Sequence, residues 1–312
     1  MKKRIALLLV LTMSISMLAA CGSSSSSSTE EAEEETEEVE EEEEEAEDAE
    51  EADETVDAEE ADETEATDDA LEVLRGATVV AKTGTTGSQY AEELAEIYDF
   101  EILYVEESST MYTYLASGQA AACFEDYPIV QYEIARGNVD CEVINVSDYS
   151  YPTGLATMAD TYPELVAAFN EGLYRLKEDG TYGEILATYF GDTGEDYSTG
   201  EDSSGEDESV YSLAEGQTYI VGTDTTFAPF EFEDDNGDFT GIDILLLEAI
   251  AEEMGFTVEW QILGFSASVT ALEANQVDAV MAGMSITDER MLKYDFSDSY
   301  YDCAIAVAVP AE

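Results

Sequence analysis

The chain has 312 residues and carries 75 Asp and Glu against 10 Lys and Arg, which gives a formal net charge of −65 at pH 7. A chain this acidic repels phosphate groups, so nucleic acid is excluded as a partner. It contains no histidine, which excludes triads, metal sites and general bases built on that residue, and we predict neither a cofactor nor a metal site.

The N-terminal segment predicts export. Basic residues at 2–4 precede an apolar run at 5–20, and Leu-Ala-Ala-Cys ends at Cys21. This arrangement is typical of a signal peptide, predicted over residues 1–20. With a cysteine directly after it, the segment resembles a bacterial lipoprotein signal, which implies a lipid on Cys21 and an anchor at the outer face of the cell membrane. The alternative is an ordinary signal peptide followed by a chance cysteine.

Residues 21–70 are predicted to form a disordered tether. A serine run comes first, and residues 29–70 are almost entirely Glu, Asp, Ala and Thr. Without large apolar residues, such a segment cannot bury enough surface to offset the entropy of ordering it. A charged spacer is the favoured interpretation, and cation scavenging by its carboxylates is the alternative.

From residue 71 onward, short apolar runs alternate with helical patterns. Strands are predicted at residues 77–81, 103–105, 120–124, 142–146 and 155–158, and helices at 87–97, 110–117, 129–135, 164–177 and 183–189. This alternation predicts an α/β fold whose mostly parallel sheets are covered by helices. An acidic linker rich in Gly and Ser is predicted over residues 192–214.

After the linker the same pattern starts again. Strands are predicted at residues 218–222, 257–261, 277–282 and 304–309, and helices at 243–254 and 266–274. Asn236-Gly237 lies between two short apolar runs and predicts a hairpin turn. The chain beyond residue 70 is therefore long enough for two lobes with cores of their own.

The cysteines leave their pairing open. Cys123, Cys141 and Cys303 follow Cys21, and an odd number cannot all pair within the chain. A Cys123–Cys141 bridge is conceivable. No Cys-x-x-Cys motif exists, so neither a redox motif nor a zinc ribbon is predicted.

Several short segments carry a family resemblance. In the second half they are VGTDTTFAPF (221–230), GID (241–243), AIA (249–251), AGMSITDER (282–290) and DFSDSYY (295–301); in the first half they are LRG (74–76), KTGTT (82–86), LASG (115–118), EDGTY (178–182) and YFG (189–191). Together they resemble an amino-acid-type periplasmic solute-binding protein, the family 3 receptors of ABC importers. The resemblance implies a two-lobed periplasmic-binding-protein type II fold that binds its ligand between closing lobes.

The half that usually comes second in this family comes first in this chain. We interpret the reversed order as a circular permutation joined through residues 192–214. A tandem pair that lacks its outer halves is the alternative. The permutation predicts lobe 2 at residues 71–148, and lobe 1 from a crossing strand and helices at 149–191 together with residues 215–312. One of the family's two usual crossings between the lobes would then be cut, which predicts a looser hinge.

An amino acid ligand needs a cation, an anion and a shaped wall. Arg290 can donate two parallel hydrogen bonds to a carboxylate, and it follows the helix start predicted at Thr287. Its alternative role is pairing with surface carboxylates. The resemblance implies that Gly283 and Ser285 offer backbone and hydroxyl partners to the ligand.

The walls of the predicted site include two aromatic residues. The resemblance implies that Phe227 and Phe265 enclose the ligand side chain, and the alternative is that both are plain core. Asp224 ends the first strand of lobe 1 and is a candidate anion.

Lobe 2 contributes a second set of candidates. Thr86, at a predicted helix start, is expected to close on the ligand carboxylate. The resemblance implies that Lys82 contacts the ligand side chain, as in glutamine-type receptors, and that Asp126 holds the ammonium; Lys82 as a solvated neighbour is the alternative. A buried acid without a cation is costly, so an empty site is expected to be open and wet.

These residues predict a receptor that is not an enzyme. It is expected to bind a polar, glutamine-like amino acid and to deliver it to the permease of an ABC transporter. The alternatives are a ligand-sensing lipoprotein, a dehydratase-like enzyme on the same fold and an acidic surface protein with a decayed pocket.

Overall fold

The computed structural model describes residues 70–191 and 205–311. The predicted signal peptide, the lipid site at Cys21, the tether and residues 192–204 of the predicted linker lie outside these ranges. Within the described part of the chain, no helix combines the length and apolar character needed to span a membrane.

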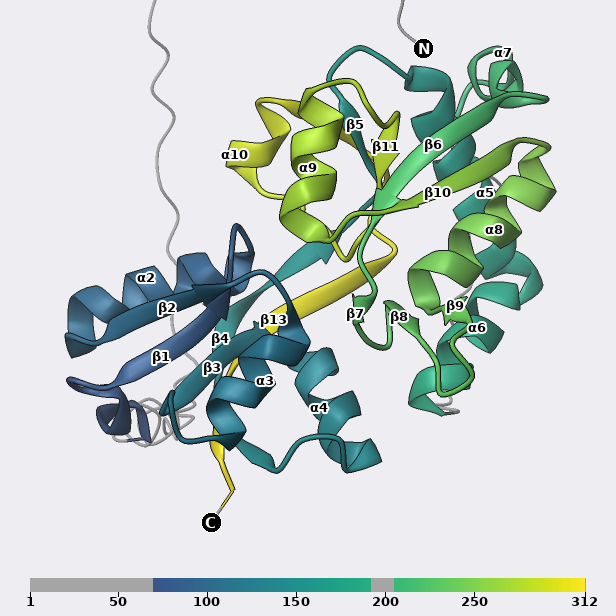
Figure 1. Ribbon diagram of the computed structural model, residues 1–312. Coiled ribbons are helices and arrows are strands. Elements are labelled where there is room, and N and C mark those ends of the chain that lie inside the picture. Colours follow the sequence, from purple (N-terminus) through teal and green to yellow (C-terminus); the bar gives the residue numbers. More distant parts are fainter. Residues whose placement is uncertain (1–69, 192–204, 312) are drawn as a thin grey trace, which may run out of the picture. The chain divides into compact units, whose positions relative to one another are not determined.

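Lobe 2 is built on a five-stranded sheet in the order β2-β1-β3-β13-β4 (Figure 1). Its strands are β1 (Thr78–Lys82), β2 (Glu101–Val105), β3 (Ala122–Asp126), β4 (Cys141–Thr153) and β13 (Tyr301–Pro310). β1 is parallel to β2 and β3, whereas β13 is antiparallel to β3 and β4. The α/β class is confirmed, and the sheet is mixed rather than mostly parallel because β13 returns from the other lobe.

Helices cover both faces of this sheet. They are α2 (Thr86–Tyr98), α3 (Ser108–Ala116) and α4 (Tyr127–Arg136), after a short η1 (Glu72–Leu74). Successive side chains of a strand point to opposite faces. Val79 therefore packs with Leu94 of α2, and Val80 packs with Met111 of α3. Burial on both faces explains why β1 is a continuous apolar run.

Lobe 1 repeats this architecture, with a sheet in the order β10-β6-β11-β5-β12. Its strands are β5 (Ala156–Met158), β6 (Thr218–Thr223), β10 (Thr257–Ile262), β11 (Ala279–Val280) and β12 (Tyr294–Phe296). β6 is parallel to β10 and β11, and β5 is antiparallel to its neighbours because it arrives from lobe 2.

A small third sheet carries the predicted hairpin. It consists of β7 (Thr226–Phe227), β8 (Glu231–Glu233) and β9 (Phe239–Thr240). Gly237 N donates to Asp234 O in the turn that joins β8 to β9. The turn predicted at Asn236-Gly237 is thereby confirmed.

The helices of lobe 1 are α5 (Pro163–Asp179), α6 (Thr181–Phe190), α8 (Ile242–Met254), α9 (Phe265–Glu273) and the single turn α10 (Asp288–Met291). α5 and α8 approach each other closely at Gly172. A Cβ atom there would lie 2.7 Å from Ile250 Cγ2 and 3.1 Å from Met254 Cγ. A glycine is therefore required by packing inside this helix.

Gly172→Leu is expected to lower the free energy of unfolding by about 2–3 kcal/mol, because overpacking forces two helices apart. Chemical denaturation monitored by circular dichroism measures the loss. Glu184→Leu, at an exposed position of α6, is the control and should change stability by about 0.5 kcal/mol or less. Equal stability of the two variants would contradict the packing argument.

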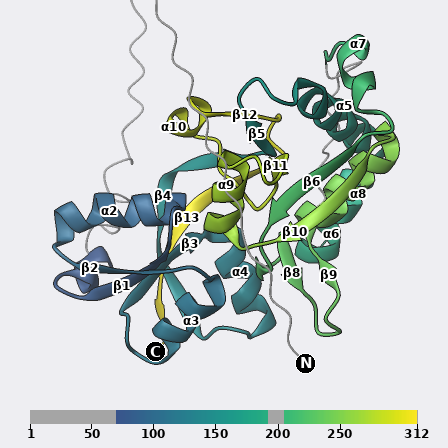
Figure 2. The same cartoon turned by 45° about the horizontal axis from the view of Figure 1, so that its top comes forward.

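The C-terminal strand corrects the predicted lobe boundary. Residues 304–309 were expected in lobe 1, but β13 pairs with β3 and β4 of lobe 2, from Tyr301 opposite Thr153 to Pro310 opposite Cys141. The chain thus crosses between the lobes twice, at the end of β4 and at the start of β13, which lie side by side in Figures 1 and 2. The predicted loss of one crossing is wrong, and the looser hinge loses its basis.

The end of the predicted linker is also folded. Residues 208–214 form α7 (Glu208–Tyr211) and η2 (Ser212–Ala214). The guanidinium of Arg175 in α5 lies 5.8 Å from the centre of the Tyr211 ring, and Ala214 is fully buried. The few apolar residues within this acidic stretch anchor it to lobe 1.

The cysteines of the described residues are unpaired. Cys123, Cys141 and Cys303 are buried free thiols. Burial raises the pKa of each of them, which keeps them protonated and poorly reactive.

Candidate functional site

A small cavity between the two lobes collects eight of the nine residues that the sequence singles out for the ligand. Lobe 2 contributes Lys82, Thr86 and Asp126, and lobe 1 contributes Phe227, Phe265, Gly283, Ser285 and Arg290. Thr85, Glu125 and Ala282 complete its lining. The ninth residue, Asp224, pairs with Lys82. The cavity measures about 20 Å³, which is room for about one water molecule.

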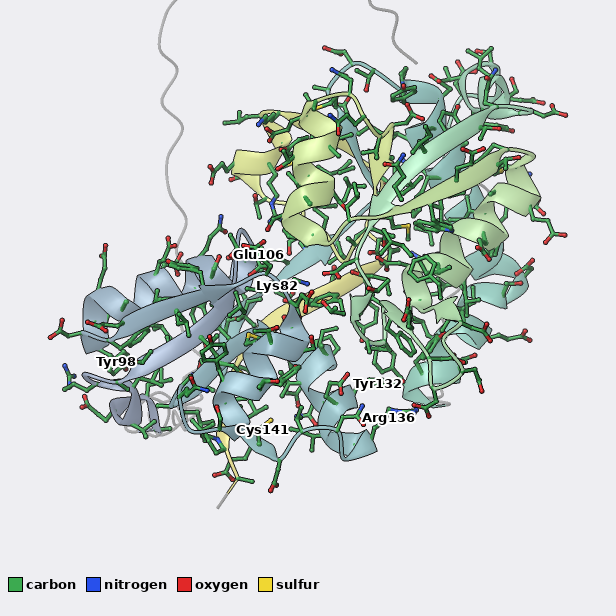
Figure 3. All side chains as sticks on the ribbon, viewed as in Figure 1. Lys82, Tyr98, Glu106, Tyr132, Arg136 and Cys141 are labelled. Atoms are coloured by element: carbon green, nitrogen blue, oxygen red, sulfur yellow. The ribbon has the colours of Figure 1, made fainter. Side chains whose placement is uncertain are left out.

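A buried ion pair joins the lobes at this cavity. Lys82 Nζ lies 2.5 Å from Asp224 Oδ2, and both side chains are only 3% exposed. Figure 3 shows Lys82 at the end of β1 that faces lobe 1. Burial alone would raise the pKa of Asp224, but the Lys82 charge, the Thr225 N–H and the Thr226 hydroxyl outweigh it and lower the pKa. Lys82 is therefore not the solvated neighbour of the alternative interpretation.

Arg290 makes a second link between the lobes. Its Nη1 donates to Ser285 O at 2.7 Å, and its Nη2 donates to Gly84 O of lobe 2 at 2.9 Å. Thr287 caps the short helix α10 by accepting from Arg290 N, as its sequence position predicted. The guanidinium fork thus faces carbonyl oxygens, and no surface carboxylate pairs with it among the described residues.

Two hydrogen bonds made by hydroxyl groups complete the closure. Thr86 Oγ1 and Ser285 Oγ are 3.1 Å apart, and Ser266 Oγ donates to Thr83 O at 3.1 Å. The prediction of an open, wet site is wrong for this structure, because polar groups of the two lobes satisfy one another across the cleft. The lobes must separate to admit any molecule larger than water, since the cavity measures only about 20 Å³.

Two adjacent carboxyl groups lie in the cavity wall. Burial raises the pKa of Asp126 well above its usual value; the neighbouring Glu125 adds to the rise, while Lys82 and Arg290 oppose it. Burial also raises the pKa of Glu125, whose Oε1 accepts from Asp126 N. Glu125 was not singled out from the sequence, although two consecutive acids at the end of an apolar strand were a usable signal.

The two phenylalanines each stand under a cation. Lys82 Nζ lies 5.0 Å from the centre of the Phe227 ring, and the Arg290 guanidinium lies 5.6 Å from that of Phe265. Such pairs attract electrostatically. Gly283 adopts a positive φ of 57°, and a Cβ atom there would lie 2.5 Å from Phe227 Cε1. Only glycine allows the loop and the ring to meet.

Gly283→Ala is expected to weaken the binding of a ligand in this cavity tenfold or more, which corresponds to about 1.4 kcal/mol. The added methyl displaces Phe227, and the left-handed backbone adds strain. Isothermal titration calorimetry measures the change. Gly84→Ala has a similar φ of 73° but meets nothing closer than 4.0 Å, so it carries the strain without the clash; equal losses in both variants would contradict a role for the Phe227 contact.

A larger hollow of about 1090 Å³ lies beside this cavity, lined by α3, α4 and the β7–β9 sheet. At its edge the ring of Tyr132 lies 6.4 Å from those of Tyr189 and Phe232 in lobe 1. Arg136, also on α4 (Figure 3), lies 3.9 Å from Asp235. It is the one basic residue among those that line the hollow in the described part of the chain. Because the hollow lies between α3 and α4 of lobe 2 and the β7–β9 sheet of lobe 1, we interpret it as the mouth of the cleft.

Comparisons with known proteins match one part of the chain. Residues 219–312 match the model of the bacterial extracellular solute-binding proteins, family 3. The lysine/arginine/ornithine-binding periplasmic protein of Escherichia coli K12 is 40% identical over 85 residues, which are 27% of this chain and 33% of that protein. The arginine-binding extracellular protein ArtP of Bacillus subtilis 168 is 40% identical over 82 residues, 26% of this chain and 32% of that protein.

A solved structure matches over a similar fraction. Substrate binding domain 2 of Lactococcus lactis GlnP, in an open conformation, is 47% identical over 24% of this chain and 32% of that chain, with a TM-score of 0.24. The chain spans about a third of the length of the curated relatives named above. The similarity to the bacterial extracellular solute-binding proteins, family 3, thus extends over residues 219–312.

Proposed function

We propose that the chain is a lipid-anchored, extracytoplasmic receptor that binds a polar amino acid between its lobes and delivers it to an ABC importer. One observation carries this proposal: a guanidinium, an ammonium, a buried carboxyl group and two aromatic rings converge on one interlobe cavity. A free amino acid presents a carboxylate, an ammonium and a side chain. Each of these has a matching group in the cavity.

In this proposal Arg290 binds the carboxylate and Asp126 binds the ammonium. Arg290 exchanges a carbonyl partner for a carboxylate, which accepts stronger hydrogen bonds because it is charged. An arriving ammonium lowers the pKa of Asp126, since an opposite charge favours the ionised form. Asp126 therefore releases its proton as the ligand binds.

Lys82 and Asp224 favour a carboxamide side chain. They place a donor and an acceptor 2.5 Å apart in the same buried corner, and a glutamine side chain offers both an oxygen acceptor and an NH₂ donor. A cationic side chain would instead face the Lys82 charge. Lys82 lies outside the residues that match the family, 219–312. The ligands of the arginine-binding relatives therefore do not carry over to this chain.

The circular permutation remains a proposal with two supports. The family match begins only at residue 219. In addition, the first and last strands of the described chain, β1 and β13, lie in the same sheet on either side of β3. A cut within lobe 2, rather than at the hinge, leaves both crossings intact. The lipid anchor is proposed from the sequence around Cys21.

Thermal unfolding of the full chain with each of the twenty amino acids at millimolar concentration tests the proposed function. Glutamine is expected to raise the melting temperature, since a ligand at a hundredfold excess over Kd stabilises the native state by about 2.7 kcal/mol. Arginine and lysine are expected to have little effect. The proposal fails if none of the twenty shifts the transition, and its carboxamide preference fails if cationic ligands shift it most.

A further inference from the structure

Directly behind the Phe227 wall lies a buried cluster that the proposed ligand does not touch. It consists of Glu231 on β8, Asp243 in the first turn of α8 and Tyr300 just before β13, each at most 1% exposed. Among the described residues, no group outside the cluster is a hydrogen-bond partner for the carboxyl oxygens of Glu231, for Asp243 Oδ1 or for the Tyr300 hydroxyl, so these groups interact only with one another. Burying polar groups with so few partners is costly, so the cluster calls for an explanation other than folding stability.

Charge balance requires at least one proton in this cluster. Burial raises the pKa of Glu231 well above its usual value; Asp243 and Asp224 add to the rise, and Lys82 is the cation that opposes it. Burial raises the pKa of Asp243 to about 6, and the Gly283 N–H holds it down. Tyr300 faces both acids. Two carboxylates side by side in a dry interior cannot both ionise readily, so Glu231 keeps its proton longer than Asp243.

The cluster contacts Gly283 and Phe227 in the lobe 1 wall of the cavity, and it also reaches the crossing strands. Asp243 Oδ2 accepts from Gly283 N at 2.9 Å, and Gly283 lies against the Phe227 ring. Glu231 is the direct cross-strand partner of Phe227 in the β7–β8 pair. Tyr300 N donates to Thr153 O, where the two crossing strands meet. A charge change at the two acids is therefore felt at the wall and beside the hinge.

We propose that Glu231 and Asp243 form a proton-linked brace, in which a shared proton keeps Gly283 and Phe227 in the positions that bind the ligand, so that losing this proton loosens the wall. Both are positioning residues, and the effect on affinity rests on the proposed function. The native state holds the proton more tightly than the unfolded chain does. The stability that the pair contributes is therefore fully present when the pH is below the usual pKa of a carboxyl group. It is lost as the pH rises through the raised pKa values of the folded protein.

The test compares the full-length wild type with Glu231→Gln and with the control Glu233→Gln, an exposed acid on the same strand. Melting temperatures are measured from pH 5 to pH 9 without ligand. Glu231→Gln keeps the shape of the protonated acid, so its advantage over the wild type is expected to grow with pH, from near zero at pH 5 to at least about 4 °C at pH 8. The control is expected to track the wild type.

Calorimetry with L-glutamine gives the second readout. The ratio of the wild-type Kd to the Glu231→Gln Kd is expected to rise several-fold over the same pH range. The ratio is used because the titration of Asp126 affects both proteins equally and cancels. If Glu231→Gln does not fold, Asp243→Asn, which keeps an oxygen for Gly283 N, takes its place with the same expectation. A pH-independent difference in melting temperature would overturn the brace. Absence of glutamine binding with the expected melting profile would instead overturn the proposed ligand and leave the brace standing.

Discussion

Arg290→Ala is expected to weaken amino acid binding by a factor of about 30 or more, equivalent to about 2–5 kcal/mol. The truncation removes the proposed partner of the ligand carboxylate. It also removes the hydrogen bond from Arg290 to Gly84 O that joins the two lobes. Isothermal titration calorimetry of the full chain gives the dissociation constants directly.

Two further variants define the origin of this loss. Arg290→Lys keeps the charge but not the fork that donates two parallel hydrogen bonds, so it should recover only part of the affinity. Arg136→Ala removes an exposed arginine at the mouth of the cleft and should leave the affinity within about twofold of the wild type. Equal binding by Arg290→Ala and the wild type would remove Arg290 from the site.

Asp224→Asn is expected to weaken ligand binding about a hundredfold or more, because removing one partner of a buried ion pair costs about 3–5 kcal/mol. The substitution destabilises the closed state, because Lys82 is 3% exposed there. The open state is affected less, because Lys82 is hydrated again when the lobes separate. The unliganded variant should therefore be more open than the wild type. Small-angle X-ray scattering would record a larger radius of gyration, and calorimetry the lost affinity.

A double variant separates charge from shape. Lys82→Met combined with Asp224→Asn removes both charges, and a buried pair replaced by uncharged groups often costs little. It should restore the closed radius of the unliganded protein while glutamine affinity stays low, because the charged donor of Lys82 and the charged acceptor of Asp224, which bind a carboxamide more strongly than neutral groups do, are gone. An unchanged radius and affinity in Asp224→Asn would mean that the pair does not control closure.

The sequence predicted the positions of the site residues because most of them end strands or start helices. Lys82 ends β1, Asp126 ends β3, Thr86 starts α2 and Phe265 starts α9. Apolar runs and capping residues mark such boundaries locally, and parallel strands bring their ends to one edge of a sheet. The resemblance to a receptor family then supplied the pairing of the two lobes.

The lobe to which the last strand belongs could not be predicted in the same way. The apolar run at residues 304–309 indicates burial, but burial on two faces fits the antiparallel position of either sheet. β13 occupies that position in lobe 2, and β5 occupies it in lobe 1. The choice depends on contacts with β3 and β4, which are distant in the sequence and leave no local signal.

The closed arrangement of the lobes and the buried acidic cluster could not be predicted from the sequence either. Lys82 and Asp224 are 142 residues apart, and no local pattern predicts that they pair instead of waiting for a ligand. The partnership of Glu231, Asp243 and Gly283 depends on β8, α8 and the loop after β11 meeting behind Phe227. Such contacts arise from tertiary packing alone.

Calorimetric titration of the full chain with the twenty amino acids tests the central claim most directly. The account predicts one-to-one binding of a polar amino acid, with glutamine foremost, at a micromolar or lower Kd that corresponds to about −8 kcal/mol or better. The same titration of Arg290→Ala should show that binding greatly reduced. A folded chain that binds none of the twenty, or that binds equally well without Arg290, would contradict an amino acid receptor built on this cavity.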